Sequence, residues 1–373
     1  MKSDCQKAPV LSIGVRAWNE EAVIRQSLQS VFQQSIFEEL SKRGECCEVL
    51  CIPNGCADRT AEIAAQVFRE QKRTHVFADS FVCRVDDVKE AGRNNTWNLF
   101  MHDFSHPQSK FLFLMDSDIM FNERATLFNM YRALLDDSRA CVSTDQQIKD
   151  ISFKKRKSWK DRLSLATSEM TGTLQGRFSG QIYCIRAELA RRIYLPKDLG
   201  APDDGFIKGV VCTNFFTEKL DPSRIVVAKN ASHIYEAYTS PGDILKNQKR
   251  QMIGQATVHV LLEYVRQLPL EQRLDLARTL REIEEADPIW LRKQLDLHLQ
   301  KARYFWRLFP GILTFRVKRW LKLTGKRRVT HLPAAVAGFL VTSIAGARAF
   351  RHLKSGQTHY WPKATREKIQ DFA

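Results

Sequence analysis

Apolar and polar positions alternate regularly along the first half of the chain. Three short segments, at residues 10–15, 48–53 and 110–115, have the apolar pattern that is typical of buried strands. Residues 20–34 and 89–104 instead carry apolar side chains at helical spacing. This alternation predicts an α/β fold in which helices cover both faces of a mostly parallel sheet.

The second half of the chain has a different pattern. Ser240, followed by Pro241, predicts the start of a helix, because serine caps a first turn and proline is tolerated at the first helical position. Helical spacing of apolar residues then continues as far as Lys301. We therefore expect a sheet domain over residues 1–240 and a helical, basic region over residues 241–373.

The formal net charge of +16 is concentrated near the C-terminus. Residues 301–373 contain 16 Lys and Arg but only 2 Asp and Glu. Over residues 303–323 large aromatic side chains alternate with these cations, which suits the headgroup boundary of a bilayer. The sequence shows no recognition-helix signature, zinc pattern or RNP-like strand. We therefore expect an anionic membrane surface as the partner, and no nucleic acid.

Residues 332–347 are uncharged and rich in small side chains. The segment has 16 residues, fewer than the roughly 20 that cross a bilayer comfortably. We interpret it as a re-entrant or interfacial helix, with a marginal span or a buried helical hairpin as alternatives. Positive flanks at both ends favour a place on the cytoplasmic face of the plasma membrane.

Two carboxylates follow the strand predicted at residues 110–115. Asp116 and Asp118 are separated by one residue and lie where this strand leaves the sheet. Such oxygen ligands suit Mg²⁺ or Mn²⁺ bridging a diphosphate. Acidic pairs are common at strand ends, and such a pair alone is weak evidence for a metal site. Here the pair follows an uninterrupted apolar strand, which adds weight to this interpretation.

Three further segments occur in a fixed order before this acidic pair. Residues 15–21 (VRAWNEE) end the first strand, residues 53–60 (PNGCADRT) end the second, and residues 89–94 (KEAGRN) open the next helix. With Asp116-Ser117-Asp118, they resemble the motifs of family 2 glycosyltransferases of the GT-A fold, especially membrane-associated bacterial members. The resemblance covers about residues 10–255.

The resemblance implies a role for individual residues. The donor-binding residues would be Asn19, Glu20, Asn54, Asp58, Lys89, Arg93 and Asp116. The metal ligands would be Asp116 and Asp118, with His233 as a less favoured third ligand. Gln248 and Arg250 would lie on the acceptor or phosphate side.

Pro202-Asp203-Asp204-Gly205 resembles the acidic pair that supplies the catalytic base of the family. The alignment assigns Asp204 to the base and Asp203 to its partner. An inverting transfer needs a carboxylate that takes the proton of the acceptor hydroxyl. Two adjacent acids favour this role, because each raises the pKa of the other.

The chain departs from the family pattern at two places. Pro53 and Asn54 stand where two acids are usual, so a uridine nucleotide is favoured but not required by the sequence. Gln251 and Met252 follow Arg250, where processive members have tryptophan, which argues against processive polymerisation.

These features predict an inverting, metal-dependent glycosyltransferase. It would move a sugar from a nucleotide-diphosphate donor, with UDP-sugar favoured, to a lipid-linked or polysaccharide acceptor of the cell envelope. Three alternatives remain: a nucleotidyltransferase of related fold, a basic membrane- or nucleic-acid-binding protein without catalysis, and a degenerate transferase kept as a scaffold. The first usually has a glycine-rich phosphate loop after strand one, where this chain has Ala17-Trp18-Asn19-Glu20.

Overall fold

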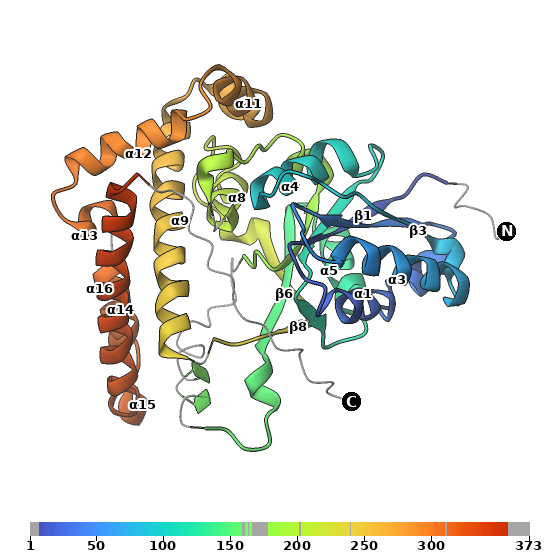
Figure 1. Cartoon of the computed structure of the whole chain (residues 1–373), viewed down its shortest axis with the longest axis horizontal. Coiled ribbons are helices and arrows are strands. Elements are labelled where there is room, and N and C mark those ends of the chain that lie inside the picture. The colour runs from blue at the N-terminus through green and yellow to red at the C-terminus, as the bar shows by residue number, and fades with distance from the viewer. Residues whose placement is uncertain are drawn as a thin grey trace.

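The computed structural model describes residues 7–158, 161–162, 164–165, 178–200, 203–238, 240–309 and 312–356 of the chain (Figure 1). In this described part, eight strands form one sheet in the order β3-β2-β1-β4-β7-β6-β8-β5. The strands are β1 (Leu11–Ala17), β2 (Cys47–Pro53), β3 (Phe81–Val85), β4 (Phe111–Asp116), β5 (Ile119–Phe121), β6 (Val142–Lys149), β7 (Ile182–Arg186) and β8 (Ile225–Tyr235).

Parallel pairing is confined to two parts of the sheet. Strands β3, β2, β1 and β4 run parallel to their neighbours, as do β6 and β8. Strand β7 is antiparallel to both β4 and β6, and β5 is antiparallel to β8. The expected α/β fold is confirmed, and the carboxyl ends of β1, β2 and β4 lie at one edge of the sheet.

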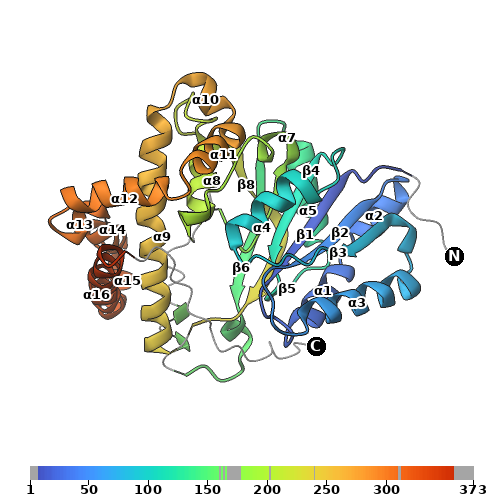
Figure 2. The same ribbon diagram turned by 45° about the horizontal axis from the view of Figure 1, so that its top comes forward.

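Helices cover both faces of the sheet, so that each face has its own core (Figure 2). Along β4, Phe111, Phe113 and Met115 enter one core, whereas Leu112 and Leu114 enter the other, as the pleat of a strand requires. The first core is completed by α1 (Ile24–Phe32), α2 (Ile36–Lys42), α3 (Thr60–Thr74) and α5 (Thr126–Asp136). The second is completed by α4 (Arg93–Leu99), η2 (Phe100–Phe104), α7 (Ala187–Ala190) and α8 (Asp203–Cys212), with helices from the C-terminal region. Short helical turns occur at η1 (Ala78–Ser80), η3 (Asp150–Phe153), η4 (Lys197–Leu199) and η5 (Pro222–Arg224).

Two helices begin later than their apolar spacing predicts. Helix α1 begins at Ile24 rather than at Glu20, and α4 begins at Arg93 rather than at Lys89. In both cases the preceding residues bond to a neighbouring loop. The backbone N–H of Glu20 donates to Thr60 Oγ1. The N–H of Gly92 donates to the Asn54 side chain. Contacts distant in sequence therefore hold these residues outside the helices.

The C-terminal region is helical, as expected. Ser240 caps α9 by accepting a hydrogen bond from the Asp243 N–H, which confirms the predicted helix start. The helices are α9 (Pro241–Gln267), α10 (Leu270–Leu274), α11 (Leu276–Ala286), α12 (Trp290–Lys301), α13 (Phe305–Leu308), α14 (Ile312–Leu321), α15 (Gly325–Thr330) and α16 (Leu332–Lys354).

Helix α9 lies between the sheet domain and the last helices (Figures 1 and 2). On one side, Val258, Leu261 and Val265 join the core that includes α8. On the other side, Met252 and Val260 join a third core with residues from α12, α13 and α16. The expected boundary at residue 240 stays a prediction, and the helices that follow it complete the core of the sheet domain.

Helix α16 contains the uncharged segment and continues to Lys354. Its second half packs against α9, where Ala345, Ala349 and Leu353 are completely buried. No helix in the described parts of the chain combines the length and the apolar character needed to cross a membrane.

Candidate active site

The loops after β1 and β2 meet at the carboxyl edge of the sheet, and Asn54 joins them. Its side-chain Nδ2 donates to the Ala17 carbonyl at 2.8 Å, and its Oδ1 accepts from the Gly92 N–H at 3.2 Å. Asn54 is buried, so both groups of its amide are satisfied within the protein. This side chain fixes the ends of two strands and the start of α4 relative to one another.

The other predicted residues of these two loops also lie together. Asn19 has a left-handed backbone (φ 53°), and its Oδ1 accepts from the Ala57 N–H at 2.7 Å. Asp58 accepts from the N–H groups of Glu21 and Thr60, each at 3.1 Å. The structure therefore brings Asn19, Glu20, Asn54 and Asp58 to one edge, where their hydrogen bonds shape the loops.

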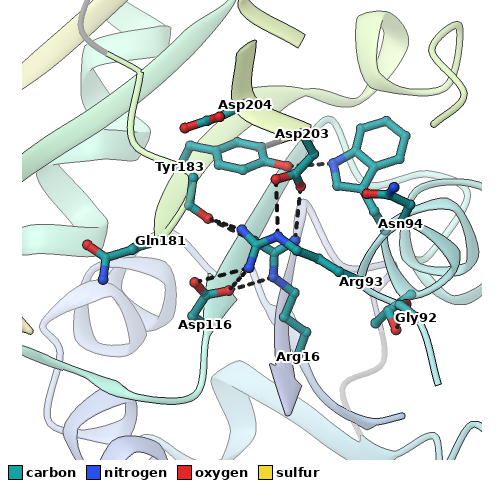
Figure 3. Close-up of polar contacts among 12 residues, drawn as sticks. Arg16, Gly92, Arg93, Asn94, Asp116, Gln181, Tyr183, Asp203 and Asp204 are labelled. Atoms are coloured by element: carbon teal, nitrogen blue, oxygen red, sulfur yellow. Dashed lines mark hydrogen bonds and ion pairs between the residues drawn. The ribbon is translucent and has the colours of Figure 1, made fainter. Parts of the chain in front are cut away.

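Four charged side chains form a compact cluster beside these loops (Figure 3). Arg16 Nε donates to Asp116 Oδ1 at 2.6 Å, and Arg16 Nη1 lies 3.3 Å from Asp203 Oδ2. Arg93 contacts the same two acids, with Nη1 3.1 Å from Asp116 Oδ1 and Nε 3.1 Å from Asp203 Oδ1. Both guanidinium groups also donate to the Gly180 carbonyl, at 2.8 and 3.1 Å. The cluster pairs two cations with two anions and has no net formal charge.

The fold explains how these residues come together. In the parallel pairing of β1 and β4, Arg16 and Asp116 are directly opposite each other. Asp203 is the first residue of α8, and Arg93 is the first residue of α4. The two strands and two helices therefore present one charged group each to the same buried position.

The arginines keep both partner acids ionised. Burial would raise the pKa of Asp116, but Arg16 and then Arg93 outweigh burial and hold this pKa below its ordinary value. Burial would likewise raise the pKa of Asp203, and Arg93 with Arg16 lowers it. The same pairing raises the pKa of Arg93 against the effect of its burial.

Asp204 has the opposite electrostatic environment from its neighbour. Its carboxylate points away from the two arginines that hold Asp203 (Figure 3). Burial, followed by the charge of Asp203, raises the pKa of Asp204 to about 6. A Cβ atom at Gly180 would lie only 3.3 Å from the Asp204 Cβ, so this glycine gives the acid its space. The adjacent acids thus differ in protonation near pH 6, with Asp204 able to exchange a proton.

The predicted metal ligands lie in different surroundings. Asp118 is partly exposed in the turn between β4 and β5. His233 is fully buried, with Nδ1 2.8 Å from both carboxylate oxygens of Asp145 and Nε2 3.2 Å from Gln181 Oε1. Across the described residues, no group of three His, Cys, Asp or Glu side chains is placed to hold a metal ion.

The remaining predicted residues lie outside the charged cluster. Lys89 is 91% exposed at its side chain, and its Nζ is 2.9 Å from Asp87. Gln248 and Arg250 are on α9, where Arg250 Nη2 donates to Asn247 at 3.0 Å. The structure places these two on the helix that packs against α8.

Arg16 had no predicted role, although it lies within the first motif. The available signal was an arginine inside an apolar strand, one residue before the strand ends. A buried cation in that position requires an anionic partner, and the neighbouring strand ends in Asp116. Asp145, the partner of His233, was missed as well.

The α/β sheet, the joined loops at its carboxyl edge and the acids gathered there are the features of a glycosyltransferase, and this chain is an enzyme of that class. The family model described as glycosyl transferase family 2 matches residues 12–191. The matched residues, just under half of the chain, form a glycosyltransferase family 2 region, and the sheet to which they contribute has the GT-A architecture.

Several solved structures are similar to this chain at low sequence identity. The mannosyltransferase PcManGT from Pyrobaculum calidifontis, in complex with GDP-Man and Mn²⁺, is 16% identical, with a TM-score of 0.49 over 92% of this chain and 88% of that one. S. aureus TarS 1–349 is 15% identical, with a TM-score of 0.44 over 93% and 92%. Glucosyl-3-phosphoglycerate synthase from Mycobacterium tuberculosis, in complex with Mn²⁺, UDP-Glc and phosphoglyceric acid, is 17% identical, with a TM-score of 0.43 over 70% and 81%. A comparison with curated proteins gave no match.

Proposed function

We propose that this chain is an inverting glycosyltransferase in which Asp204 is the general base. The donor would be a nucleotide-diphosphate sugar, with UDP-sugar favoured, and the acceptor a lipid-linked or polysaccharide hydroxyl. The observation that carries the proposal is the asymmetry of the acidic pair. Asp203 is neutralised by two arginines, whereas Asp204 lies beside it with a pKa raised to about 6.

The proposed step follows from this asymmetry. Above about pH 6 Asp204 is ionised and takes the proton of the acceptor hydroxyl. The acceptor oxygen then forms a bond to the anomeric carbon from the face opposite the nucleotide. The bond between that carbon and the phosphate oxygen breaks, its electron pair leaves with the diphosphate, and the configuration inverts. Asp203 stays ionised throughout, because Arg16 and Arg93 compensate its charge.

The donor would bind across the loops at the carboxyl edge of the sheet. We assign Asn19, Glu20, Asn54 and Asp58 to the walls of the nucleoside pocket, since these residues fix the two loops that form it. Arg93 is the more exposed of the two arginines of the cluster, with 21% of its side chain accessible against 4% for Arg16, and a guanidinium suits a phosphate group.

Mn²⁺ or Mg²⁺ fits the same edge through Asp118. These cations commonly use one or two carboxylates and take their other ligands from phosphates and water, so a partly exposed Asp118 suffices. When bound, the cation would offset negative charge that develops on the departing diphosphate. Asp116 already contacts two arginines, and His233 contacts Asp145. We therefore assign the principal protein ligand of the cation to Asp118.

The basic helices at the C-terminus support a membrane-linked acceptor. An enzyme that uses a lipid-linked or envelope polysaccharide acceptor would work at the cytoplasmic face of the membrane, where anionic lipids attract lysine and arginine. The excess of cations after residue 300 fits that location.

The base is tested by Asp204→Asn, which keeps the side-chain shape but removes the proton acceptor. We expect nucleotide-sugar binding, measured by calorimetry, to change little, and transfer to fall by about a hundredfold or more. In the unaltered enzyme the rate should rise with pH through about 6, as Asp204 loses its proton. Transfer that survives in Asp204→Asn with the same pH profile would assign the base to another residue.

A further inference from the structure

Helix α16 exposes a row of large aliphatic side chains. Leu332, Val336, Leu340 and Ile344 are each between 43% and 55% exposed, and they recur at four-residue spacing. Side chains four residues apart in a helix lie on successive turns of one side, so these four form a continuous ridge. We call this ridge the apolar stripe.

Packing within the protein does not require the apolar stripe. The side of α16 that contacts α9 carries its own buried residues, including Ala345, Ala349 and Leu353. A Cβ atom at Gly346 would lie 2.9 Å from the Phe305 ring, so this side of the helix is tightly packed. The stripe is therefore additional apolar surface, and adjoining apolar surface of this kind marks an interaction site.

Two neighbouring helices also expose apolar side chains. Helix α14 packs against α16 and exposes Val317 and Leu321, and α15 exposes Val329. In Figures 1 and 2 these three helices lie on the side of α9 that is remote from the sheet. The surface is therefore on the opposite side of α9 from α8, the helix that carries Asp203 and Asp204.

The charge of the chain segment that contains the apolar stripe has a single sign. Residues 301–356 contain 13 Lys and Arg and no Asp or Glu. Exposed cations occur on both sides of the stripe along the chain, at Lys318, Lys322, Arg328, Arg348, Arg351 and Lys354. Aliphatic side chains flanked by long cationic ones match a bilayer surface, where the chains enter the acyl boundary and the charges meet headgroups.

We propose that the apolar stripe and its flanking cations form a docking surface for an anionic lipid bilayer. The inference rests on the proposed membrane location and is independent of the transfer chemistry. A second copy of the chain fits this surface less well, because self-association would bring together two helical segments that carry cations and no acids. Nucleic acid would leave the aliphatic ridge without an apolar partner.

Vesicle flotation with the full-length protein tests the proposal. The probes are vesicles of phosphatidylcholine mixed with phosphatidylglycerol, and vesicles of phosphatidylcholine alone. We expect flotation with the mixed vesicles, weaker flotation with the neutral ones, and a decrease at high salt. Replacing both Leu340→Asp and Ile344→Asp should weaken binding to the mixed vesicles by at least about tenfold.

A matched control replaces exposed aliphatic residues of the sheet domain. Leu135→Asp with Leu220→Asp adds the same charge at side chains that are 44% and 65% exposed, and flotation should be unchanged. Replacing both Arg348→Glu and Arg351→Glu should weaken binding to the mixed vesicles and leave binding to the neutral vesicles unchanged. Circular dichroism and nucleotide titration check that each variant is folded. A variant that loses vesicle binding but binds nucleotide normally has a defect in the docking surface and not in the proposed donor site.

Three outcomes would overturn the proposal. Equal flotation of the Leu340→Asp, Ile344→Asp variant and the unaltered protein would show that the apolar stripe is not the docking surface. A dimer that dissociates in this variant, without vesicle binding by either form, would assign the surface to a second copy. Binding to duplex DNA at moderate salt, without flotation, would assign the cations to nucleic acid.

Discussion

Arg16 contacts the same three partners as Arg93, although no motif assigned it a role. Its Nε, Nη1 and Nη2 atoms reach Asp116, Asp203 and the Gly180 carbonyl respectively. The planar guanidinium donates from three nitrogen atoms in fixed directions, whereas an ammonium group donates from a single nitrogen atom. Because Arg16 is buried, each of these acceptors would lose a partner that water does not readily replace.

Replacing Arg16→Ala should therefore destabilise the fold by about 3 kcal/mol or more, since an uncompensated acidic charge would remain in a buried site. Equilibrium urea unfolding measures the change. Arg16→Lys should recover only part of the loss, because one ammonium group cannot reproduce the three contacts. Arg59→Ala is the matched control, since Arg59 pairs with Glu62 at an exposed position and should matter little. Equal stability of the Arg16→Ala and Arg59→Ala variants would contradict the buried-cluster account.

At the scale of elements, α8 determines where the acidic pair lies. Asp203 and Asp204 are in its first turn, where the positive end of the helix dipole favours an ionised Asp203. Gly205 and Gly209 of α8 bring it close to α9, and a Cβ atom at Gly209 would lie 2.7 Å from the Leu262 side chain. The position of the proposed base thus depends on a helix of the C-terminal region.

Strand β1 gives an element-scale prediction. A Cβ atom at Gly14 would lie 2.7–2.9 Å from three atoms of the buried Phe100 ring, so the strand needs glycine there. Gly14→Ala should lower the free energy of unfolding by about 1–3 kcal/mol, as overpacking does in a filled core. Thermal or urea unfolding measures this change. Gly242→Ala serves as the control, because a Cβ atom there would lie 3.9 Å from the nearest atom. Phe100→Leu in the Gly14→Ala background should restore part of the lost stability. An unchanged midpoint for Gly14→Ala would show that the ring can move aside.

At the scale of the whole molecule, α9 makes the two regions interdependent. It contributes to the core shared with α8 and to the core shared with α16. Leu276, Leu280 and Trp290, from α11 and α12, also pack into the core of the sheet domain. The basic region is thus attached to the catalytic domain through shared apolar packing.

A chain truncated after residue 240 should therefore fail to fold cooperatively. It would lack the apolar residues of α9, α11 and α12 that close the second core, leaving a large apolar surface exposed. Circular dichroism during urea unfolding, with the full-length protein as control, distinguishes the cases. A truncated protein that unfolds in one transition with nearly full stability would support an independent domain ending at residue 240.

Local patterns predicted much of this structure because they depend on neighbours in the chain. Strand periodicity located β1, β2 and β4, and the Ser240 cap located the start of α9. Interactions between residues distant in sequence could not be predicted in this way. The contact between Arg16 and Asp203 joins residues 187 positions apart, and no local pattern encodes the choice of partner.

The sequence by itself determined the α/β class, the family, the acids at the strand ends and the basic, acid-free character of the C-terminal helices. Tertiary structure decided which acids are neutralised by Arg16 and Arg93, and it gave Asp204 a pKa different from that of its neighbour. It also decided which side of α16 is buried and which is exposed. The reason is physical: helix and strand patterns arise from short-range periodicity, whereas pKa shifts and exposure depend on groups that only folding brings together.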